Sequence, residues 1–182
     1  MRYIFLLFVF IIPSADASVK ENILLSLKNI QNLNFNFTQT INGKDETGNC
    51  TILYPKKIYC KYNLRNNKEL VSNGKSLVIK SDKNKQYYRY PLDDTPLVYI
   101  LDKKFIIDKI ENQKEKLIDE KFYLFEIVEN NQKINIFFEK ENLKLIGWQT
   151  EDLYQNLTVT FIYDLKINYE VDKKIFKLPL MY

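Results

Sequence analysis

The stretch that decides the fold is GNCTILYPKKIYCKY, residues 48–62, in which two runs of β-branched and aromatic residues flank Pro55. Such runs are typical of β-strands, and the Pro-Lys-Lys sequence between them favours a turn. If the two arms pair around Pro55, Cys50 lies opposite Cys60. Directly opposed residues on antiparallel strands are close enough for a disulfide. The stretch therefore predicts a hairpin closed by a disulfide between Cys50 and Cys60.

The same pairing gives the hairpin an apolar side. Ile52 faces Ile58, and Tyr54 and Tyr62 share a side, because side chains alternate along a strand. We therefore expect the hairpin to form one apolar wall of a larger structure.

Residues 1–17 predict a cleaved export signal. A basic start at Arg2 precedes a continuous apolar run, and Ala15-Asp16-Ala17 has the small-x-small form of a cleavage site. The apolar run is too short to span a bilayer. We therefore expect cleavage after Ala17 and an exported, periplasmic protein in which residues 18–182 form a single domain.

Composition argues against several classes of function. The chain carries 27 Lys and Arg against 23 Asp and Glu, a net charge of +4, and these charges are interspersed, which argues against nucleic-acid binding. It has no histidine, which excludes imidazole-dependent zinc sites and histidine-based catalytic triads. Two cysteines in an exported chain favour one disulfide over a metal site. We expect no cofactor and no metal.

Residues 18–41 predict an amphipathic helix followed by a half-buried strand. Ser18–Glu21 is a possible capping box, and apolar residues recur at helical spacing from Val19 to Ile30. From Leu33 to Ile41 the apolar period is two, which indicates a strand. Gln39 is the polar member of its apolar face, and is either a hydrogen-bonded core amide or part of a cavity wall.

The rest of the chain is dominated by short strands. Asn73-Gly74 between apolar arms predicts a tight hairpin, because both residues tolerate positive φ. Residues 105–120 are ambiguous between helix and strand. The further strands are expected at residues 86–91, 122–129, 133–139, 143–150 and 157–163. The last strand places Leu157, Val159, Phe161 and Tyr163 on one apolar face.

Thr95-Pro96 looks like a helix N-cap followed by proline at the first helical position. The short helix that follows, Leu97–Leu101, is apolar on every side. A surface helix should have a polar face, so this helix is either a buried connector or a cover across an apolar opening.

We expect a mainly β fold with some helix (α+β). Roughly ten or eleven strands with few crossover helices favour an antiparallel sheet, and a sheet this long must curl. The predicted architecture is a strongly curved antiparallel sheet that forms an incomplete β-barrel, with an N-terminal helix and short lid helices. Its inner surface should be apolar and either filled or ready for an apolar guest.

Several stretches, taken in order, resemble a known family. They are the export signal, the amphipathic helix, Phe35–Gln39, Gly48–Tyr62, Val71–Leu77, Thr95–Leu97, Gly147-Trp148 and Phe176–Pro179. Together they resemble the periplasmic outer-membrane lipoprotein carrier family, LolA. The resemblance implies a half-barrel with a helical lid whose cavity takes the acyl chains of a lipoprotein. The partners that the resemblance implies are acylated lipoproteins, an inner-membrane lipoprotein-releasing ABC transporter and, if one is present, an outer-membrane acceptor. We expect a monomer.

The expected acyl-chain-binding residues are Phe35, Phe37, Ile52, Ile58, Tyr62, Leu97, Ile100, Leu101, Trp148 and Phe161. The expected lid or latch residues are Tyr54, Pro55, Pro96 and Tyr99. By resemblance, Pro55 matches the proline of the family's Arg-Pro turn. Tyr54 replaces the arginine that is thought to hold the lid closed, and Ile58 replaces an aromatic residue.

Two other functions are considered. The first is a periplasmic lipid-sensing regulatory protein that uses the same curved sheet. The second is an enzyme, for which the adjacent carboxylates Asp93-Asp94 and Asp119-Glu120 are the candidates. We interpret these carboxylates as solvated turns, and no serine sits in a nucleophile-elbow pattern. We therefore expect no catalytic residues and a protein that is not an enzyme.

Overall fold

The computed structural model describes residues 18–63, 67–81, 86–151 and 156–180, so the predicted export signal lies outside the described part of the chain. The helices, with η for a 3-10 helix, are α1 (Val19–Asn29), η1 (Leu92–Asp94), α2 (Leu97–Leu101), α3 (Lys103–Glu111) and η2 (Lys173–Phe176). The strands are β1 (Asn32–Ile41), β2 (Lys44–Leu53), β3 (Lys57–Tyr62), β4 (Glu69–Asn73), β5 (Ser76–Ser81), β6 (Gln86–Pro91), β7 (Lys116–Ile118), β8 (Phe122–Glu129), β9 (Gln132–Glu139), β10 (Leu145–Glu151) and β11 (Leu157–Ile167).

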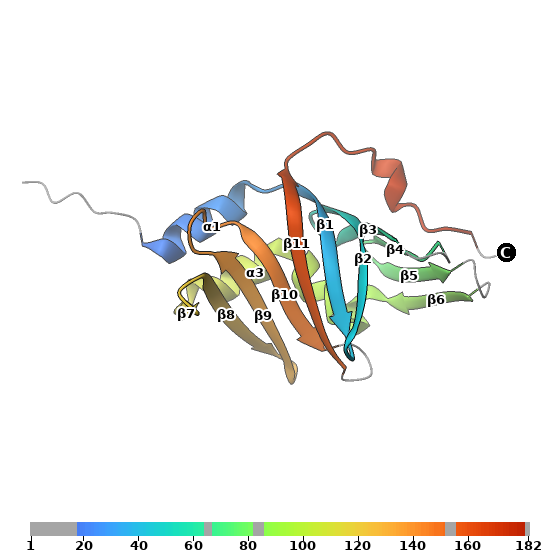
Figure 1. The fold of residues 1–182 in the computed structure, drawn as a ribbon. Helices are drawn as coiled ribbons and strands as arrows, with labels where there is room; N and C mark the ends of the chain where they lie inside the picture. Colours follow the sequence, from blue (N-terminus) through green and yellow to red (C-terminus); the bar gives the residue numbers. More distant parts are fainter. Residues whose placement is uncertain (1–17, 64–66, 82–85, 152–155, 181–182) are drawn as a thin grey trace, which may run out of the picture.

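The strands form one 11-stranded sheet in the order β6-β5-β4-β3-β2-β1-β11-β10-β9-β8-β7. Its neighbouring strands pair antiparallel, and the end strands β6 and β7 do not pair with each other. Figure 1 shows the sheet strongly curved, with α1 and α3 on one side of the β7–β10 half. The predicted incomplete barrel with an N-terminal helix is confirmed.

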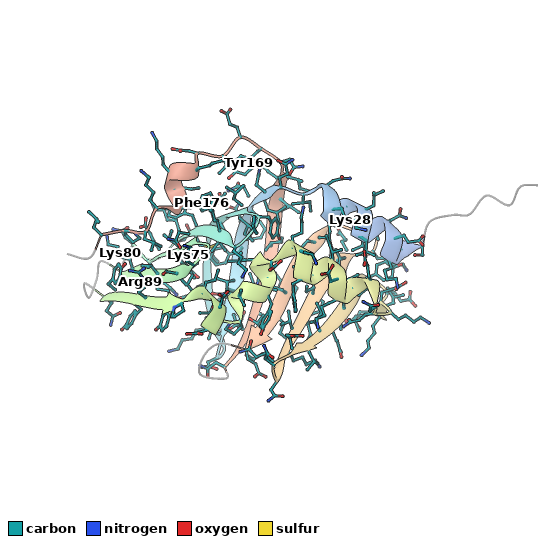
Figure 2. All side chains as sticks on the ribbon, turned by 180° about the vertical axis from the view of Figure 1, so that it is seen from behind. Lys28, Lys75, Lys80, Arg89, Tyr169 and Phe176 are labelled. Carbon is teal, nitrogen blue, oxygen red and sulfur yellow. A yellow bond between two sulfur atoms is a disulfide. The ribbon has the colours of Figure 1, made fainter. Side chains whose placement is uncertain are left out.

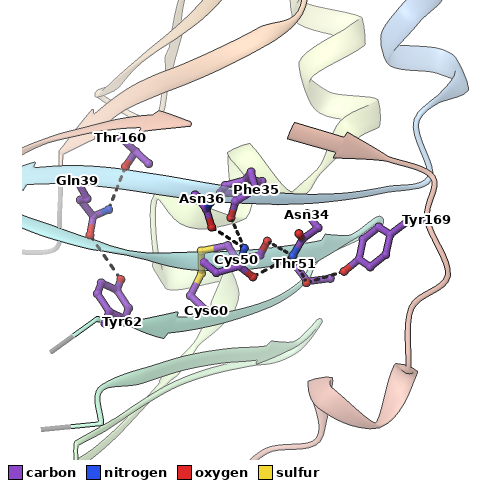
Figure 3. The surroundings of a disulfide bond; sticks show 11 residues. Asn34, Phe35, Asn36, Gln39, Cys50, Thr51, Cys60, Tyr62, Thr160 and Tyr169 are labelled. Atoms are coloured by element: carbon purple, nitrogen blue, oxygen red, sulfur yellow. Dashed lines mark hydrogen bonds between the residues drawn. A yellow bond between two sulfur atoms is a disulfide. The ribbon is translucent and has the colours of Figure 1, made fainter. Parts of the chain in front are cut away.

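The hairpin around Pro55 forms as predicted. β2 and β3 pair with Cys50 directly opposite Cys60, and the disulfide joins Cα atoms that are 4.1 Å apart. β2 also pairs along its whole length with β1 (Figure 3). The disulfide-closed hairpin is therefore one wall of the curved sheet.

The predicted N-terminal helix and first strand are also confirmed. Ser18 Oγ accepts a hydrogen bond from the Glu21 backbone at 3.2 Å, and the Glu21 carboxylate accepts from the Ser18 backbone at 2.7 Å, which completes the capping box. On β1, Leu33, Phe35 and Phe37 are buried at every second position. In the described ranges, no helix has the length and hydropathy needed to cross a membrane.

Two lysines tie α1 to α3. Lys103 Nζ, at the start of α3, donates to the carbonyls of Lys28 (3.0 Å) and Ile30 (2.5 Å) at the end of α1. In return, Lys20 Nζ in the first turn of α1 donates to the carbonyl of Glu111 at 3.2 Å, at the end of α3. Cations at helix C-termini satisfy carbonyls that lack an intrahelical partner. The two helices therefore stay together on the sheet.

The prediction that Thr95 caps the short helix is wrong. Pro96 takes the N-cap position, and α2 begins at Leu97. The Thr95 hydroxyl instead donates to the carbonyl of Leu92 at 2.8 Å. The cause is η1, which ends directly before this segment and presents that carbonyl to the hydroxyl.

The hairpin at Asn73-Gly74 forms between β4 and β5 as predicted. Only Gly74 takes a positive φ, of 97°. The Asn73 side chain instead accepts hydrogen bonds from the backbone N–H groups of Lys75 and Ser76, both at 3.0 Å. The asparagine thus shapes this turn through its side chain rather than through its backbone.

The ambiguous segment 105–120 contains both kinds of element. Its first part belongs to α3, which ends at Glu111, and its later part forms the short strand β7. Asp119 and Glu120 follow β7 with φ values of 49° and 55°, in the turn to β8. Both side chains are exposed, which confirms their interpretation as a solvated turn.

The apolar face of β11 points outward, contrary to the prediction that such alternating faces line the interior. Leu157 and Phe161 are each 50% exposed, and the Phe161 ring meets that of Phe137 at 6.5 Å on the outer surface. The pairing with β1 decides the orientation, because it places Thr160 opposite Gln39 on the inner face. Phe161 is therefore not an interior residue.

The C-terminal segment runs back across the outer face of the β2–β6 half. The Tyr169 hydroxyl lies 2.7 Å from Thr51 Oγ1, and Tyr87 donates to the carbonyl of Pro179 at 3.3 Å. Phe176 is buried between η2 and the sheet (Figure 2). The chain itself thus covers part of this face of the sheet.

Candidate functional site

An apolar cavity of about 260 Å³ lies inside the curve of the sheet, beside the start of α2. Its walls come from β1–β6, β10 and β11, with Pro96 and Leu97 of the helical segment on the remaining side. The apolar and aromatic lining residues are Phe37, Ile41, Ile58, Tyr62, Leu70, Leu77, Ile79, Tyr90, Leu97 and Trp148. The disulfide also lines the cavity, so the disulfide-closed hairpin forms one wall of the cavity as expected.

The other half of the interior is filled. A void of only about 10 Å³ remains beneath the helices, and its lining includes Ile52, Tyr54 and Ile100. Trp148 borders both this void and the larger cavity. Its indole meets the buried Phe35 ring edge to face at 5.9 Å. The indole therefore separates the packed half from the hollow half.

The predicted acyl-chain-binding residues divide into four groups. The larger cavity brings together Phe37, Ile58, Tyr62, Leu97 and Trp148. Ile52 and Ile100 reach only the small void beneath the helices. Phe35 and Leu101 are fully buried outside both linings, and Phe161 is on the outer face.

Sequence reasoning missed several cavity residues on β4, β5 and β6. Leu70, Leu77, Ile79 and Tyr90 all line the cavity. The signal was present, because Leu77 and Ile79 alternate along a predicted strand. The curvature that brings this distant strand around the cavity is a property of the whole sheet.

Three contacts tie the α2 region to its neighbours. The Lys56 backbone N–H, in the turn after Pro55, donates to the Leu101 carbonyl at 2.8 Å. Lys56 Nζ also pairs with Asp93 of η1 at 3.1 Å. At the other side of the helix, the Tyr99 hydroxyl accepts from Asn130 at 3.0 Å.

Tyr54 does not supply a polar latch in this structure. Among the described residues none forms a hydrogen bond with its hydroxyl, and its ring packs against the core. Burial raises the pKa of Tyr54, so the phenol stays neutral. Pro55 is exposed at the turn. The tie between this turn and α2 comes from Lys56.

A polar row crosses one end of the cavity (Figure 3). Gln39 Nε2 donates to Thr160 Oγ1 at 3.0 Å, and the Tyr62 hydroxyl lies 3.5 Å from Gln39 Oε1. Lys68 Nζ sits 4.2 Å from the centre of the Tyr62 ring and pairs with Glu46 at 2.6 Å. Gln39 is thus both a hydrogen-bonded amide and part of the cavity wall.

The open sheet, its apolar hollow and the short helix beside that hollow define a binding protein built on an incomplete barrel. The chain belongs to the family described as outer membrane lipoprotein carrier protein LolA, whose model matches residues 28–179. This family is periplasmic, and the disulfide suits an oxidising compartment.

Two solved structures reach a TM-score of at least 0.50 and show the same fold. An uncharacterized conserved protein from Thermus thermophilus has a TM-score of 0.51 and 9% identity, over 87% of this chain and 93% of that chain. MucB has a TM-score of 0.50 and 12% identity, over 93% of this chain and 65% of its own. The LolA superfamily protein NE2245 from Nitrosomonas europaea has a TM-score of 0.46 and 11% identity, over 89% and 99%. A comparison with curated proteins gave no match.

Proposed function

We propose that this protein is a periplasmic carrier that binds lipoprotein acyl chains in its apolar cavity. It receives them from an inner-membrane ABC transporter and delivers them to the outer membrane, without catalysing a reaction. The observation that supports this role best is the hollow half of the barrel, lined by apolar side chains such as Phe37, Leu77 and Leu97.

The need for a carrier follows from the cost of exposing acyl chains to water. Each methylene moved from an apolar environment into water costs about 0.8 kcal/mol. Two or three long acyl chains therefore cost on the order of tens of kcal/mol. A lipoprotein cannot cross the periplasm at that cost, so a protein must supply an apolar interior during the transfer.

The resting cavity is small for such a ligand. Sites for drug-sized molecules are roughly 300–1,000 Å³, whereas this one is about 260 Å³. We infer that α2 moves when several chains enter, because Pro96 and Leu97 form one side of the cavity. The three polar contacts described above for the α2 region involve turns and η1 rather than strands. The helix can therefore move while the strands of the sheet stay paired.

Mass spectrometry of the protein purified from the cell envelope tests the carrier function. We expect co-purified acylated lipoproteins and, after cross-linking, an inner-membrane ABC transporter. If neither the lipoproteins nor the transporter is recovered from cells that express the protein at its natural level, the proposal is contradicted.

A second candidate is a periplasmic lipid-sensing regulator that uses the same apolar cavity on a fold shared with MucB. MucB has been solved in complex with MucA, and this chain spans only 65% of MucB. The same cross-linking experiment separates the two functions. A membrane-bound signalling protein in place of the transporter supports the regulator.

A further inference from the structure

The polar row at one end of the cavity contains hydrogen-bond donors for which the described part of the chain offers no acceptor. Thr160 is only 3% exposed, and its hydroxyl accepts a hydrogen bond from Gln39. A hydroxyl can accept and donate at once, yet among the described residues nothing accepts the Thr160 proton. The second amide hydrogen of Gln39 likewise has no acceptor in the described ranges.

A buried donor such as the Thr160 hydroxyl normally finds a partner, because leaving it unpaired away from water is costly, whereas Gln39 is half-buried. Gln39 and Thr160 both line the cavity, so a molecule bound there can accept a hydrogen bond from each of them. The rest of the lining is mainly apolar. A ligand that satisfies both regions has an alkyl chain and, at one end, a hydrogen-bond acceptor.

The charges at this end decide which kind of acceptor fits. In the described ranges, the charged residues that line the cavity are Lys68 and Glu151. Lys68 is already paired with Glu46, and both side chains of this pair are 21% exposed. Two carboxylates therefore accompany one ammonium group. A third negative charge, such as a fatty-acid carboxylate, is disfavoured here, whereas a neutral carbonyl is not.

We propose that Gln39 and Thr160 form a subsite for the neutral carbonyl of an acyl ester or amide, with the alkyl chain lying along the apolar wall. This inference rests on the proposed carrier function and specifies its ligand. The cavity is expected to prefer an acyl ester to a free fatty acid of the same chain length.

Displacement of a fluorescent apolar dye, N-phenylnaphthylamine, from the purified protein tests the subsite. Glycerol monolaurate and laurate compete with the dye at a pH where laurate is ionised. We expect the glyceride to bind more tightly than laurate. In Gln39→Leu and Thr160→Val, glyceride affinity should fall about tenfold, as expected for the loss of one buried hydrogen bond. Dye affinity should hold or rise, which also shows that each variant keeps its cavity.

Two further variants sharpen the test. Thr38→Val, on the opposite face of the same strand, is the matched control and should bind the glyceride like the parent protein. Glu46→Gln leaves the Lys68 ammonium unpaired, so laurate affinity should rise about fivefold while glyceride affinity changes little.

The outcomes separate this subsite from the function on which it rests. Three results would overturn the carbonyl subsite. The first is unchanged glyceride affinity in both Gln39→Leu and Thr160→Val, and the second is an equal fall in dye and glyceride affinity in these variants. The third is tighter binding of laurate than of glyceride to the parent protein. Failure of both acyl compounds to displace bound dye from the parent protein overturns the carrier proposal itself.

Discussion

The backbone N–H of Lys56 donates a 2.8 Å hydrogen bond to the carbonyl of Leu101, which joins the turn of the disulfide hairpin to the end of α2. The Lys56 carbonyl in turn accepts from the Ser72 hydroxyl at 2.9 Å. The helix beside the cavity is thus tied to the cavity's own wall. The side chain adds a further tie to Asp93, just before the helix.

Removal of this side-chain tie should speed ligand entry without unfolding the protein. In Lys56→Gln the ion pair with Asp93 is lost, but the backbone bond to Leu101 remains. Because the Asp93 side chain is 76% exposed, we expect the free energy of unfolding to fall by less than about 1 kcal/mol. Stopped-flow dye uptake should be a few-fold faster. Lys61→Gln, exposed on the neighbouring strand, is the control, and equal uptake rates in the two variants would argue against the tie.

A charge at Leu97 should weaken binding of apolar ligands. Leu97 is half-buried and lines the cavity, so Leu97→Asp removes apolar surface and adds a carboxylate that resists desolvation. We expect dye affinity to fall tenfold or more, measured by fluorescence titration, with the circular dichroism spectrum retained. Ile100 is a poorer test, because it is 3% exposed and a charge there should destabilise the fold. Leu25→Asp, at a site 61% exposed on α1, should leave binding unchanged.

The disulfide should stabilise the protein moderately. Cys50 and Cys60 are 10 residues apart, and closing so short a loop contributes about 2–3 kcal/mol in the chain-entropy model. Chemical denaturation of Cys50→Ser should show a loss of that size. The double variant with Cys60→Ser should show the same loss, since each substitution removes the same bond. Two free thiols in protein purified from the periplasm would show that this disulfide does not form there and would contradict the prediction.

The buried tyrosine of the cavity should make stability fall at high pH. Burial, and to a smaller degree the Glu46 carboxylate, raises the pKa of Tyr62 above its ordinary value of 10.0. The folded state therefore keeps the phenol proton after the unfolded state has begun to lose it. The stabilisation is complete below pH 10.0 and declines as the pH rises from there toward the raised folded pKa.

Denaturation of Tyr62→Phe across this pH range checks the effect. The variant should lose less stability with rising pH than the parent protein does. Tyr163 lies on the outer face and is 48% exposed, so Tyr163→Phe is the control. Parallel pH profiles for the parent protein and Tyr62→Phe would falsify the assignment of this pH dependence to Tyr62.

Lys103 should stabilise the helical layer through the end of α1. Its ammonium donates to two carbonyls there, so Lys103→Met should reduce the free energy of unfolding by about 1–2 kcal/mol. Lys104→Met is a closely matched control, because the neighbouring ammonium pairs with exposed Asp108 on its own helix. Similar losses in the two variants, measured by urea denaturation, would contradict a special role for Lys103.

Much of the fold was predictable because it depends on local patterns. The alternation from Leu33 to Ile41 and the strand-Pro-strand pattern at 48–62 each predict their own pairing and buried side. The site was predictable only in part. Leu97 and Trp148 line the cavity, whereas Leu101 is buried in the core although it lies on the same short helix as Leu97. A helix that is apolar all round does not reveal which side meets the hollow.

By itself, the sequence determined the open antiparallel architecture, the capped first helix and the position of the disulfide, because these follow from neighbouring residues and short periods. Only the tertiary structure decided which face of each strand lines the cavity. Phe161 shows the difference, since its strand alternates clearly but its pairing with β1 turns the aromatic side outward and Thr160 inward. A strand has two faces, and contacts with distant segments select the inner one.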